Sequence, residues 1–209
     1  MSELFLAIGI ARHRMGSDGV GVTTLVGGYG CPLACRYCLN PQCTRITTKP
    51  IAYTIESLYE AVRADSLYFD ATGGGITFGG GEPLLQAEFI ADFIRFCRQK
   101  GEGWTFAAET CLAVPEEKLR AVLPYIDEWI VDVKDMDDEI YRAYTGRESD
   151  AMKANLAILA ETCPDKVRVK TPLIPDFNSP EHLLRSQIAL TDMGFAKLER
   201  LRYQTEIKK

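Results

Sequence analysis

Short apolar runs alternate with amphipathic stretches along most of the chain, from Val20 onward. The runs predict strands at Val22–Val26, Gly75–Phe78, Trp104–Ala107, Glu128–Val133, Val167–Leu173 and Leu198–Tyr203. The amphipathic stretches predict helices at Ile55–Ala64, Leu84–Gln99, Glu116–Leu123, Asp138–Tyr144, Ala151–Ala160 and Pro180–Thr191. Strands separated by helices pair in parallel, with the helices outside the sheet. About six such units are too few to close an eight-stranded barrel. The pattern therefore predicts an α/β fold, a partial, open (βα)6 TIM-type barrel, as one domain over residues 1–209.

Composition narrows the class of protein. The chain has 209 residues, of which 46% are hydrophobic and 25% charged, as in ordinary globular proteins. A net charge of −5 argues against a nucleic-acid partner, because such proteins are usually basic. No apolar window is long enough to span a membrane, and the N-terminus lacks the pattern of a signal peptide. Seven cysteines, an odd number, suit a reducing compartment. We therefore expect a cytoplasmic protein that binds neither nucleic acid nor membrane.

Three of these cysteines form one short motif. Cys31, Cys35 and Cys38 are spaced Cys-x3-Cys-x2-Cys between glycine and proline residues. Three thiolates are one too few for a closed tetrahedral zinc site or for a four-thiolate iron–sulfur centre. An iron–sulfur cube held by three thiolates keeps one iron open for another ligand. The alternatives are a partial zinc site or three ordinary buried cysteines.

The spacing resembles the signature of the radical S-adenosylmethionine (SAM) superfamily, in which an aromatic residue, here Tyr37, usually precedes the third cysteine. The resemblance implies a 4Fe-4S cluster held by Cys31, Cys35 and Cys38, with SAM chelating the open iron. In that superfamily the reduced cluster cleaves SAM to methionine and a 5′-deoxyadenosyl radical. The partial open barrel is also the fold that the resemblance implies.

A glycine-rich run follows the predicted strand Gly75–Phe78 and continues into Gly80-Gly81-Glu82-Pro83. Glycines let the backbone approach a ligand closely, although the run alone could be only a tight turn. It lacks the Gly-Lys-Ser/Thr ending of a phosphate-binding loop, which disfavours nucleotide hydrolysis. Beside the cysteine motif, it resembles the Gly-Gly-Glu-Pro motif with which radical SAM enzymes hold the amino group of SAM.

Charged and polar residues lie at the ends of two further predicted strands: Glu109-Thr110 follows Trp104–Ala107, and Asp132-Val133-Lys134-Asp135 ends the next strand. The carboxyl ends of adjacent parallel strands meet at one mouth, so these side chains are expected to converge. A sulfonium with a free ammonium needs acceptors, and a carboxylate needs a cation such as Lys134. The alternative is that these residues are solvated loop charges.

Taken together, the motifs resemble the glycyl-radical-enzyme activating enzymes, the pyruvate formate-lyase activating enzyme-like subgroup. The segments that carry the resemblance are Asp18-Gly19-Val20-Gly21, Cys38-Leu39-Asn40-Pro41, Gly80-Gly81-Glu82-Pro83-Leu84-Leu85-Gln86, Glu109-Thr110, Asp132-Val133-Lys134 and Pro172-Leu173-Ile174-Pro175. The implied reaction removes an α-hydrogen from one glycine of a partner glycyl radical enzyme. The implied conditions are anaerobic, with reduced flavodoxin or ferredoxin as the electron donor.

The resemblance also implies roles for single residues. The Tyr37–Cys38 backbone would lie beside the adenine, and Lys134 would face the SAM carboxylate. Three residues would cradle the amino group with help from Glu109: Gly80, Gly81 and Glu82. Three are candidates for a small monovalent cation site: Glu109, Thr110 and Asp132.

The chain departs from the subgroup at several positions. Val20 replaces a proline, and Gln204 stands where a histidine usually faces SAM. Of the remaining cysteines, Cys43 is expected to be a free surface thiol, whereas Cys97 and Cys111 are expected to pack in the interior. Two other functions stay open at this point. One is a radical SAM enzyme acting on another peptide or a small molecule, and the other is a non-catalytic iron–sulfur electron carrier.

Overall fold

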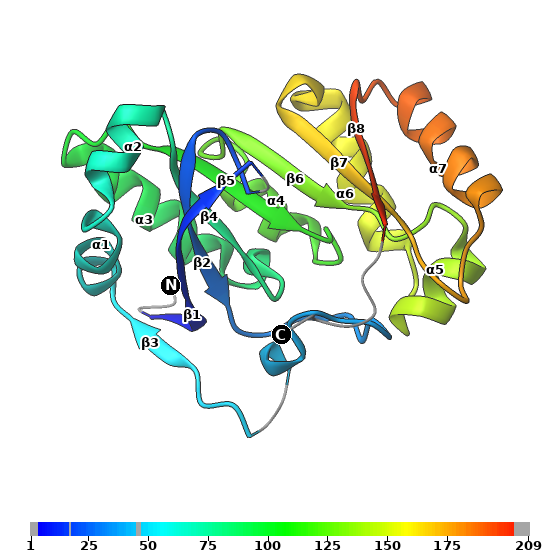
Figure 1. Cartoon of the computed structure of the whole chain (residues 1–209), viewed down its shortest axis with the longest axis horizontal. Coiled ribbons are helices and arrows are strands. Elements are labelled where there is room, and N and C mark those ends of the chain that lie inside the picture. Colours follow the sequence, from blue (N-terminus) through cyan, green and yellow to red (C-terminus); the bar gives the residue numbers. More distant parts are fainter. Residues whose placement is uncertain (1–3, 17, 45–46, 203–209) are drawn as a thin grey trace.

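The computed structural model describes residues 4–16, 18–44 and 47–202. Within them, eight strands form one sheet in the order β3-β1-β2-β4-β5-β6-β7-β8 (Figure 1). Their bounds are β1 Phe5–Met15, β2 Val22–Gly28, β3 Ile51–Tyr53, β4 Gly75–Gly80, β5 Thr105–Thr110, β6 Glu128–Asp132, β7 Val167–Leu173 and β8 Lys197–Arg202. β2 and β4 to β8 pair in parallel, and β1 and β3 are antiparallel additions at the β2 edge. The two edges of the sheet do not pair with each other, so the prediction of an open, partial barrel is confirmed.

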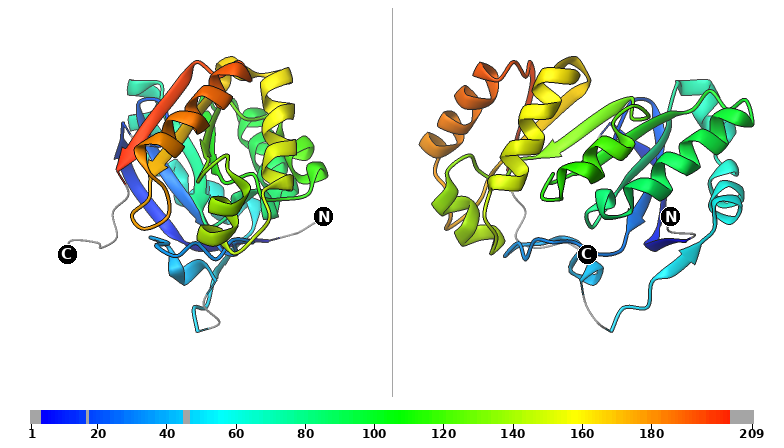
Figure 2. Two further views of the ribbon diagram at one scale, coloured as in Figure 1. Left: turned by 90° about the vertical axis from the view of Figure 1, so that its right-hand side faces the viewer. Right: turned by 180° about the vertical axis from the view of Figure 1, so that it is seen from behind.

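Helices connect the parallel strands and lie outside the curved sheet, as Figure 2 shows from two further sides. Their bounds are α1 Ile55–Arg63, α2 Ser66–Thr72, α3 Ala87–Gln99, α4 Glu116–Val122, α5 Asp138–Thr145, α6 Asp150–Thr162 and α7 Pro180–Asp192. Short 3-10 turns cover Pro41–Cys43, Pro83–Gln86 and Pro164–Lys166. None of the described helices has the length and apolar character needed to cross a membrane.

The strands have one face toward the helices and one toward the barrel interior. Ile76 and Phe78 of β4 and Phe106 of β5 are fully buried in the apolar core with the helices. The residues between them face the interior, because successive side chains of a strand point to opposite faces. The hydroxyl of Thr77, for example, donates a hydrogen bond to the backbone carbonyl of Asp18 in the β1–β2 connection. This connection therefore lies inside the barrel, beside β4 and β5.

Several predicted elements have other limits in the structure. β4 continues to Gly80 and β5 to Thr110. The glycine-rich motif and the Glu109-Thr110 motif therefore begin within these strands rather than after them. The β4 ladder continues because Gly79 and Gly80 pair in register with Gly27 and Gly28 of β2. The predicted helix Leu84–Gln99 is divided into a 3-10 turn and α3. β1, β3 and α2 were not predicted.

Candidate cofactor site

The cysteine loop, residues 28–38, begins at the last residue of β2 and runs along the carboxyl ends of the parallel strands (Figure 1). Backbone hydrogen bonds attach its first part to the glycine-rich loop after β4. The Gly81 N–H donates to the Gly28 carbonyl at 3.0 Å, and the Glu82 N–H donates to the Gly30 carbonyl at 2.8 Å. The two sequence motifs, about fifty residues apart, are therefore directly paired.

The other end of the cysteine loop is attached to α5. The Ala34 N–H donates to the Thr145 carbonyl at 2.9 Å, and the Arg36 N–H donates to the Tyr144 carbonyl at 3.1 Å. These carbonyls lie at the C-terminal end of the helix, where such groups lack partners within the helix. Cys35 lies between the two donors, so its backbone is fixed against α5.

A cavity of about 180 Å³ lies between the cysteine loop and the glycine-rich loop. It is lined by Cys31, Leu33, Ala34, Cys35, Cys38, Asn40, Pro41, Cys43, Thr44, Gly80 and Gly81. The structure thus brings the three predicted cluster ligands together with two of the predicted SAM-binding glycines. In the part of the chain that the structure describes, no three His, Cys, Asp or Glu side chains converge closely enough to hold a metal ion. The three cysteines therefore line one cavity, but their side chains are not close enough together to bind one metal ion.

Glycine is required where the two loops touch. Gly80 has a φ of +88°, a left-handed conformation that residues with a Cβ rarely adopt. A Cβ on Gly81 would overlap the carbonyl oxygen of Gly30 in the facing loop. The side-chain amide of Asn40 donates to the Gly80 carbonyl at 3.0 Å and adds a third link between the loops.

Cys43 is not the surface thiol that the sequence predicted. It is only 1% exposed, and its carbonyl accepts a hydrogen bond from the Gly30 N–H at 2.9 Å. Burial raises the pKa of the Cys43 thiol to about 12. The prediction was wrong because its polar sequence neighbours gave no sign of the tertiary contact with the cysteine loop.

The carboxylate of Glu82 is fully buried and accepts hydrogen bonds from its own chain. Oε1 accepts from the Thr110 hydroxyl at 2.7 Å and the Leu84 N–H at 3.0 Å. Oε2 accepts from the Cys111 N–H at 2.8 Å and the Cys111 thiol at 2.9 Å. Burial raises the pKa of Glu82, and these hydrogen bonds oppose that rise. The side chain therefore ties the glycine-rich loop to the end of β5.

Cys111 has a role in the site that the sequence did not predict. Its thiol donates to Glu82 and lies next to the thiol of Cys31, and the interaction between the two thiols lowers the pKa of Cys31. The same interaction with Cys31, together with burial, raises the pKa of Cys111. Its position directly after the Glu109-Thr110 pair was the available sequence signal.

The charged residues at the strand ends form two separate ion pairs. Lys134 lies 2.5 Å from Asp132, and Lys170 of β7 lies 2.7 Å from Glu109. Both lysines are only 8% exposed. Thr110 and Glu109 are successive in β5, so the Thr110 hydroxyl faces Glu82 while the Glu109 carboxylate faces Lys170. The structure therefore does not bring the side chains of the three candidate cation ligands together.

Sequence reasoning did not identify Lys170. Its signal was the alternation in Arg168-Val169-Lys170, where the fully buried Val169 separates two charged side chains on the opposite face of β7. Arg168 pairs with Glu128 at 3.1 Å, and Lys170 reaches the mouth of the barrel.

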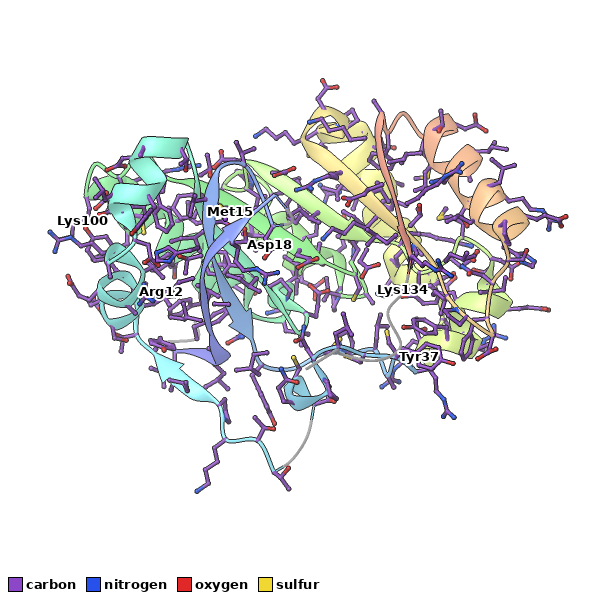
Figure 3. The ribbon with its side chains drawn as sticks, in the orientation of Figure 1. Arg12, Met15, Asp18, Tyr37, Lys100 and Lys134 are labelled. Carbon is purple, nitrogen blue, oxygen red and sulfur yellow. The ribbon has the colours of Figure 1, made fainter. Side chains whose placement is uncertain are left out.

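Tyr37 lies at the outer end of the cysteine loop, and Lys134 lies nearer the strand ends (Figure 3). The Tyr37 hydroxyl donates to the Asp176 carboxylate at 3.0 Å. Its ring centroid is 6.2 Å from that of Tyr144 and 6.0 Å from that of Phe177. The backbone next to Cys38 is thus held by an aromatic cluster. Gln204, the expected substitute for a SAM-contacting histidine, lies outside the described residues.

The donor set fits an iron–sulfur cluster with SAM beside it. Three thiols line a cavity with two glycines, whose backbone is accessible to a ligand. Asp132 Oδ1 is buried and has no hydrogen-bond partner among the described residues, so the mouth retains an acceptor for a cationic ligand. Lys134 supplies a positive charge on the same side.

An open α/β barrel with a three-cysteine loop at the carboxyl ends of its strands is the architecture of an enzyme that carries a site-differentiated iron–sulfur cluster. The chain belongs to the radical SAM superfamily, whose profile matches residues 25–185. Membership implies a 4Fe-4S cluster and SAM as its cofactors.

Relatives of this chain are named as activating enzymes. It is 30% identical over 194 residues to a pyruvate formate-lyase-activating enzyme of Clostridium pasteurianum, covering 90% of this chain and 78% of the relative. It is 40% identical over 125 residues to a (2S)-3-sulfopropanediol dehydratase activating enzyme of Klebsiella oxytoca. That match covers 60% of this chain but only 38% of the relative.

Solved structures agree in fold. SuiB of Streptococcus suis bound to S-adenosylmethionine superposes with a TM-score of 0.63 at 16% identity, over 87% of this chain and 41% of that chain. Methylornithine synthase superposes with a TM-score of 0.60 at 13% identity, over 88% of this chain and 54% of that chain. At these identities the likeness concerns the fold alone.

Proposed function

We propose that this protein activates a glycyl radical enzyme by removing the α-hydrogen of one glycine in that partner. The observation that carries the proposal is that Cys31, Cys35 and Cys38 line the same cavity at the strand ends as Gly80 and Gly81. The activating-enzyme names of the relatives support the class of substrate. The proposed electron donor is a reduced flavodoxin or ferredoxin, and the proposed location is the cytoplasm.

In the proposed site, Cys31, Cys35 and Cys38 would hold the cluster in the cavity that Gly80 and Gly81 also line. Gly80 and Gly81 present backbone groups to the amino end of SAM, and Lys134 neutralises its carboxylate. Glu82 acts indirectly, because its carboxylate is occupied by donors from its own chain. A monovalent cation at Glu109, Thr110 and Asp132 would require these side chains to rearrange or backbone oxygens to contribute.

When bound, the reduced cluster and SAM together supply one electron and the 5′-carbon that accepts the glycine hydrogen atom. SAM, one electron and the partner's glycine C–H thus become methionine, 5′-deoxyadenosine and a glycyl radical. The protein orients the reacting groups and excludes water from them. The ion pairs Glu109–Lys170 and Asp132–Lys134, each with a buried lysine and a half-buried carboxylate, fix the charges around the mouth before SAM binds.

The test is anaerobic reconstitution of the full chain with iron and sulfide. We expect about four irons per chain in the wild type, as the open-cube chemistry requires, and loss of the cluster in a Cys31→Ala/Cys35→Ala/Cys38→Ala variant. Cys163→Ala is the matched control, because this half-buried thiol lies outside the cavity. Adding SAM should change the EPR spectrum of the reduced cluster and yield 5′-deoxyadenosine.

The substrate is tested by incubating the reduced, SAM-loaded protein with candidate glycyl radical enzymes. A glycyl-radical EPR doublet on the partner supports the proposal. Formation of 5′-deoxyadenosine with no radical on any glycyl radical enzyme would point to another peptide or a small molecule as the substrate. A cluster that does not respond to SAM would instead indicate an electron carrier.

A further inference from the structure

Tyr141 of α5 has a buried hydroxyl without a hydrogen-bond partner among the described residues. The residue is 1% exposed and belongs to the main apolar core. A buried tyrosine hydroxyl usually has a partner, because losing its contact with water without replacement costs free energy. An unsatisfied group of this kind in a native chain requires an explanation, such as an ion or cofactor that it contacts.

Hydrogen bonds connect the backbone of Tyr141 to the cysteine loop through Thr145. It lies one helical turn before Thr145, whose hydroxyl donates to the Tyr141 carbonyl at 2.7 Å. The Thr145 carbonyl accepts from Ala34, the neighbour of Cys35. Tyr141 and Cys35 thus lie on segments that backbone hydrogen bonds hold together.

The surroundings of the hydroxyl are the side chains of the candidate site. The ionisable side chains close enough to influence its pKa are those of Cys111, Cys35, Lys134 and Glu82. Burial, the largest influence, raises the pKa of Tyr141, so the hydroxyl stays protonated and remains a donor. Both Cys35 and Cys111 pack against the same core cluster as the tyrosine ring.

We propose that Tyr141 donates a hydrogen bond to a sulfur of the 4Fe-4S cluster or to its Cys35 ligand, and thereby raises the reduction potential of the cluster. Sulfur carries more negative charge after the cluster accepts an electron, so such a bond stabilises the reduced state more than the oxidised state. The inference rests on the proposed assignment of Cys31, Cys35 and Cys38 as cluster ligands. Tyr141 tunes the electron-transfer step without taking part in hydrogen abstraction.

The test is Tyr141→Phe, which removes the hydroxyl and keeps the ring. EPR-monitored titration of the reconstituted protein should give a more negative reduction potential than the wild type. Resonance Raman spectra should show a D2O-induced shift of Fe–S stretching in the wild type that is reduced in the variant. Tyr59→Phe is the control. Tyr59 lies on α1, outside the cavity lining, and its hydroxyl donates a hydrogen bond to Glu102 at 2.6 Å.

Unfolding measurements separate this role from packing. Without the cluster, Tyr141→Phe should leave the free energy of unfolding unchanged or higher, because it removes an unsatisfied group. An unchanged potential with an unchanged D2O shift would overturn the proposal. If the variant does not fold, 3-fluorotyrosine at position 141 is a stronger donor and should move the potential in the positive direction. A wild type that holds no 4Fe-4S cluster would instead contradict the proposed function, which iron and sulfide analysis decides separately.

Discussion

Glu82 combines two functions that its sequence motif does not distinguish. The motif predicts that the residue contributes to SAM binding, and the structure shows a carboxylate that binds Thr110, Leu84 and Cys111. Its backbone N–H meanwhile donates to the cysteine loop. The residue therefore fixes the position of the glycines that precede it, and its effect on SAM is exerted through their backbone.

The raised pKa of Glu82 predicts how stability depends on pH. The folded chain binds this proton more tightly than the unfolded chain, whose glutamates titrate near 4.5. The stabilisation is therefore fully present below pH 4.5 and is lost as the pH rises through the folded pKa. Glu82→Gln lacks this loss, so its free energy of unfolding should improve relative to the wild type between pH 4 and neutrality. Denaturant unfolding across that range measures the difference, and a difference independent of pH would contradict the prediction.

Gly81→Ala should destabilise the contact between the two loops. Its Cβ would overlap the Gly30 carbonyl, and overpacking against fixed backbone costs about 1–3 kcal/mol. The free energy of unfolding measured with a denaturant and the iron content after reconstitution should both decrease. Gly103→Ala is the control, because nothing lies within 4 Å of its added Cβ. Equal behaviour of the two variants would show that the loops separate without cost.

At the residue scale, local motifs predicted five of the residues that line the cavity, the three cysteines and the two glycines, but not the partners of the site residues. Cys31, Cys35 and Cys38 are recognisable from spacing alone, because they lie within eight residues. Lys170 contacts Glu109, and Cys111 contacts Glu82, only in the folded sheet, because the partners are far apart in the sequence. The same limit explains the wrong prediction for Cys43.

At the scale of elements, the cysteine loop is a bridge between the glycine-rich loop and α5. The exposed Arg147 adds to this bridge, since its Nε donates to the Pro32 carbonyl at 2.9 Å. The central β/α units were predictable because each carries its own periodic pattern. β1 was not, because its second half is polar and exposed and its pairing with β2 and β3 is antiparallel.

Arg147→Ala should loosen the loop while leaving the fold nearly as stable. A hydrogen bond of this kind contributes about 0.5–1.5 kcal/mol net, and less where solvent competes. Hydrogen exchange of the Ala34 and Arg36 amides should accelerate in the chain without iron. Arg142→Ala is the matched control on α5, because its guanidinium pairs with Glu148 at 2.6 Å rather than with the loop. Acceleration in both variants would indicate fraying of the helix instead.

At the scale of the whole molecule, the alternating pattern correctly predicted the open sheet, whose six parallel strands carry the candidate site at their carboxyl ends. The apolar core lies between the sheet and the helices, and the cavity lies at the rim of the sheet. That residues 1–209 form a single domain stays a prediction.

The distribution of thiols predicts a pattern of alkylation for the native chain without iron. Cys38 is exposed and should react first, whereas Cys43 and Cys97 are buried, with pKa values raised to about 12. Reconstitution with iron and sulfide should protect Cys31, Cys35 and Cys38. Mass spectrometry of the labelled peptides measures both patterns. Rapid labelling of Cys97 before unfolding would contradict the burial of this thiol on α3.

The attachment of the cysteine loop to its neighbours by backbone hydrogen bonds has a consequence for assembly. In small zinc domains the metal drives folding, so the empty polypeptide is a random coil. Here backbone hydrogen bonds to the glycine-rich loop and to α5 attach the cysteine loop, and none of them involves a thiol. We therefore expect a chain without iron to keep this loop attached, so that a cluster can be inserted after folding or restored after its loss.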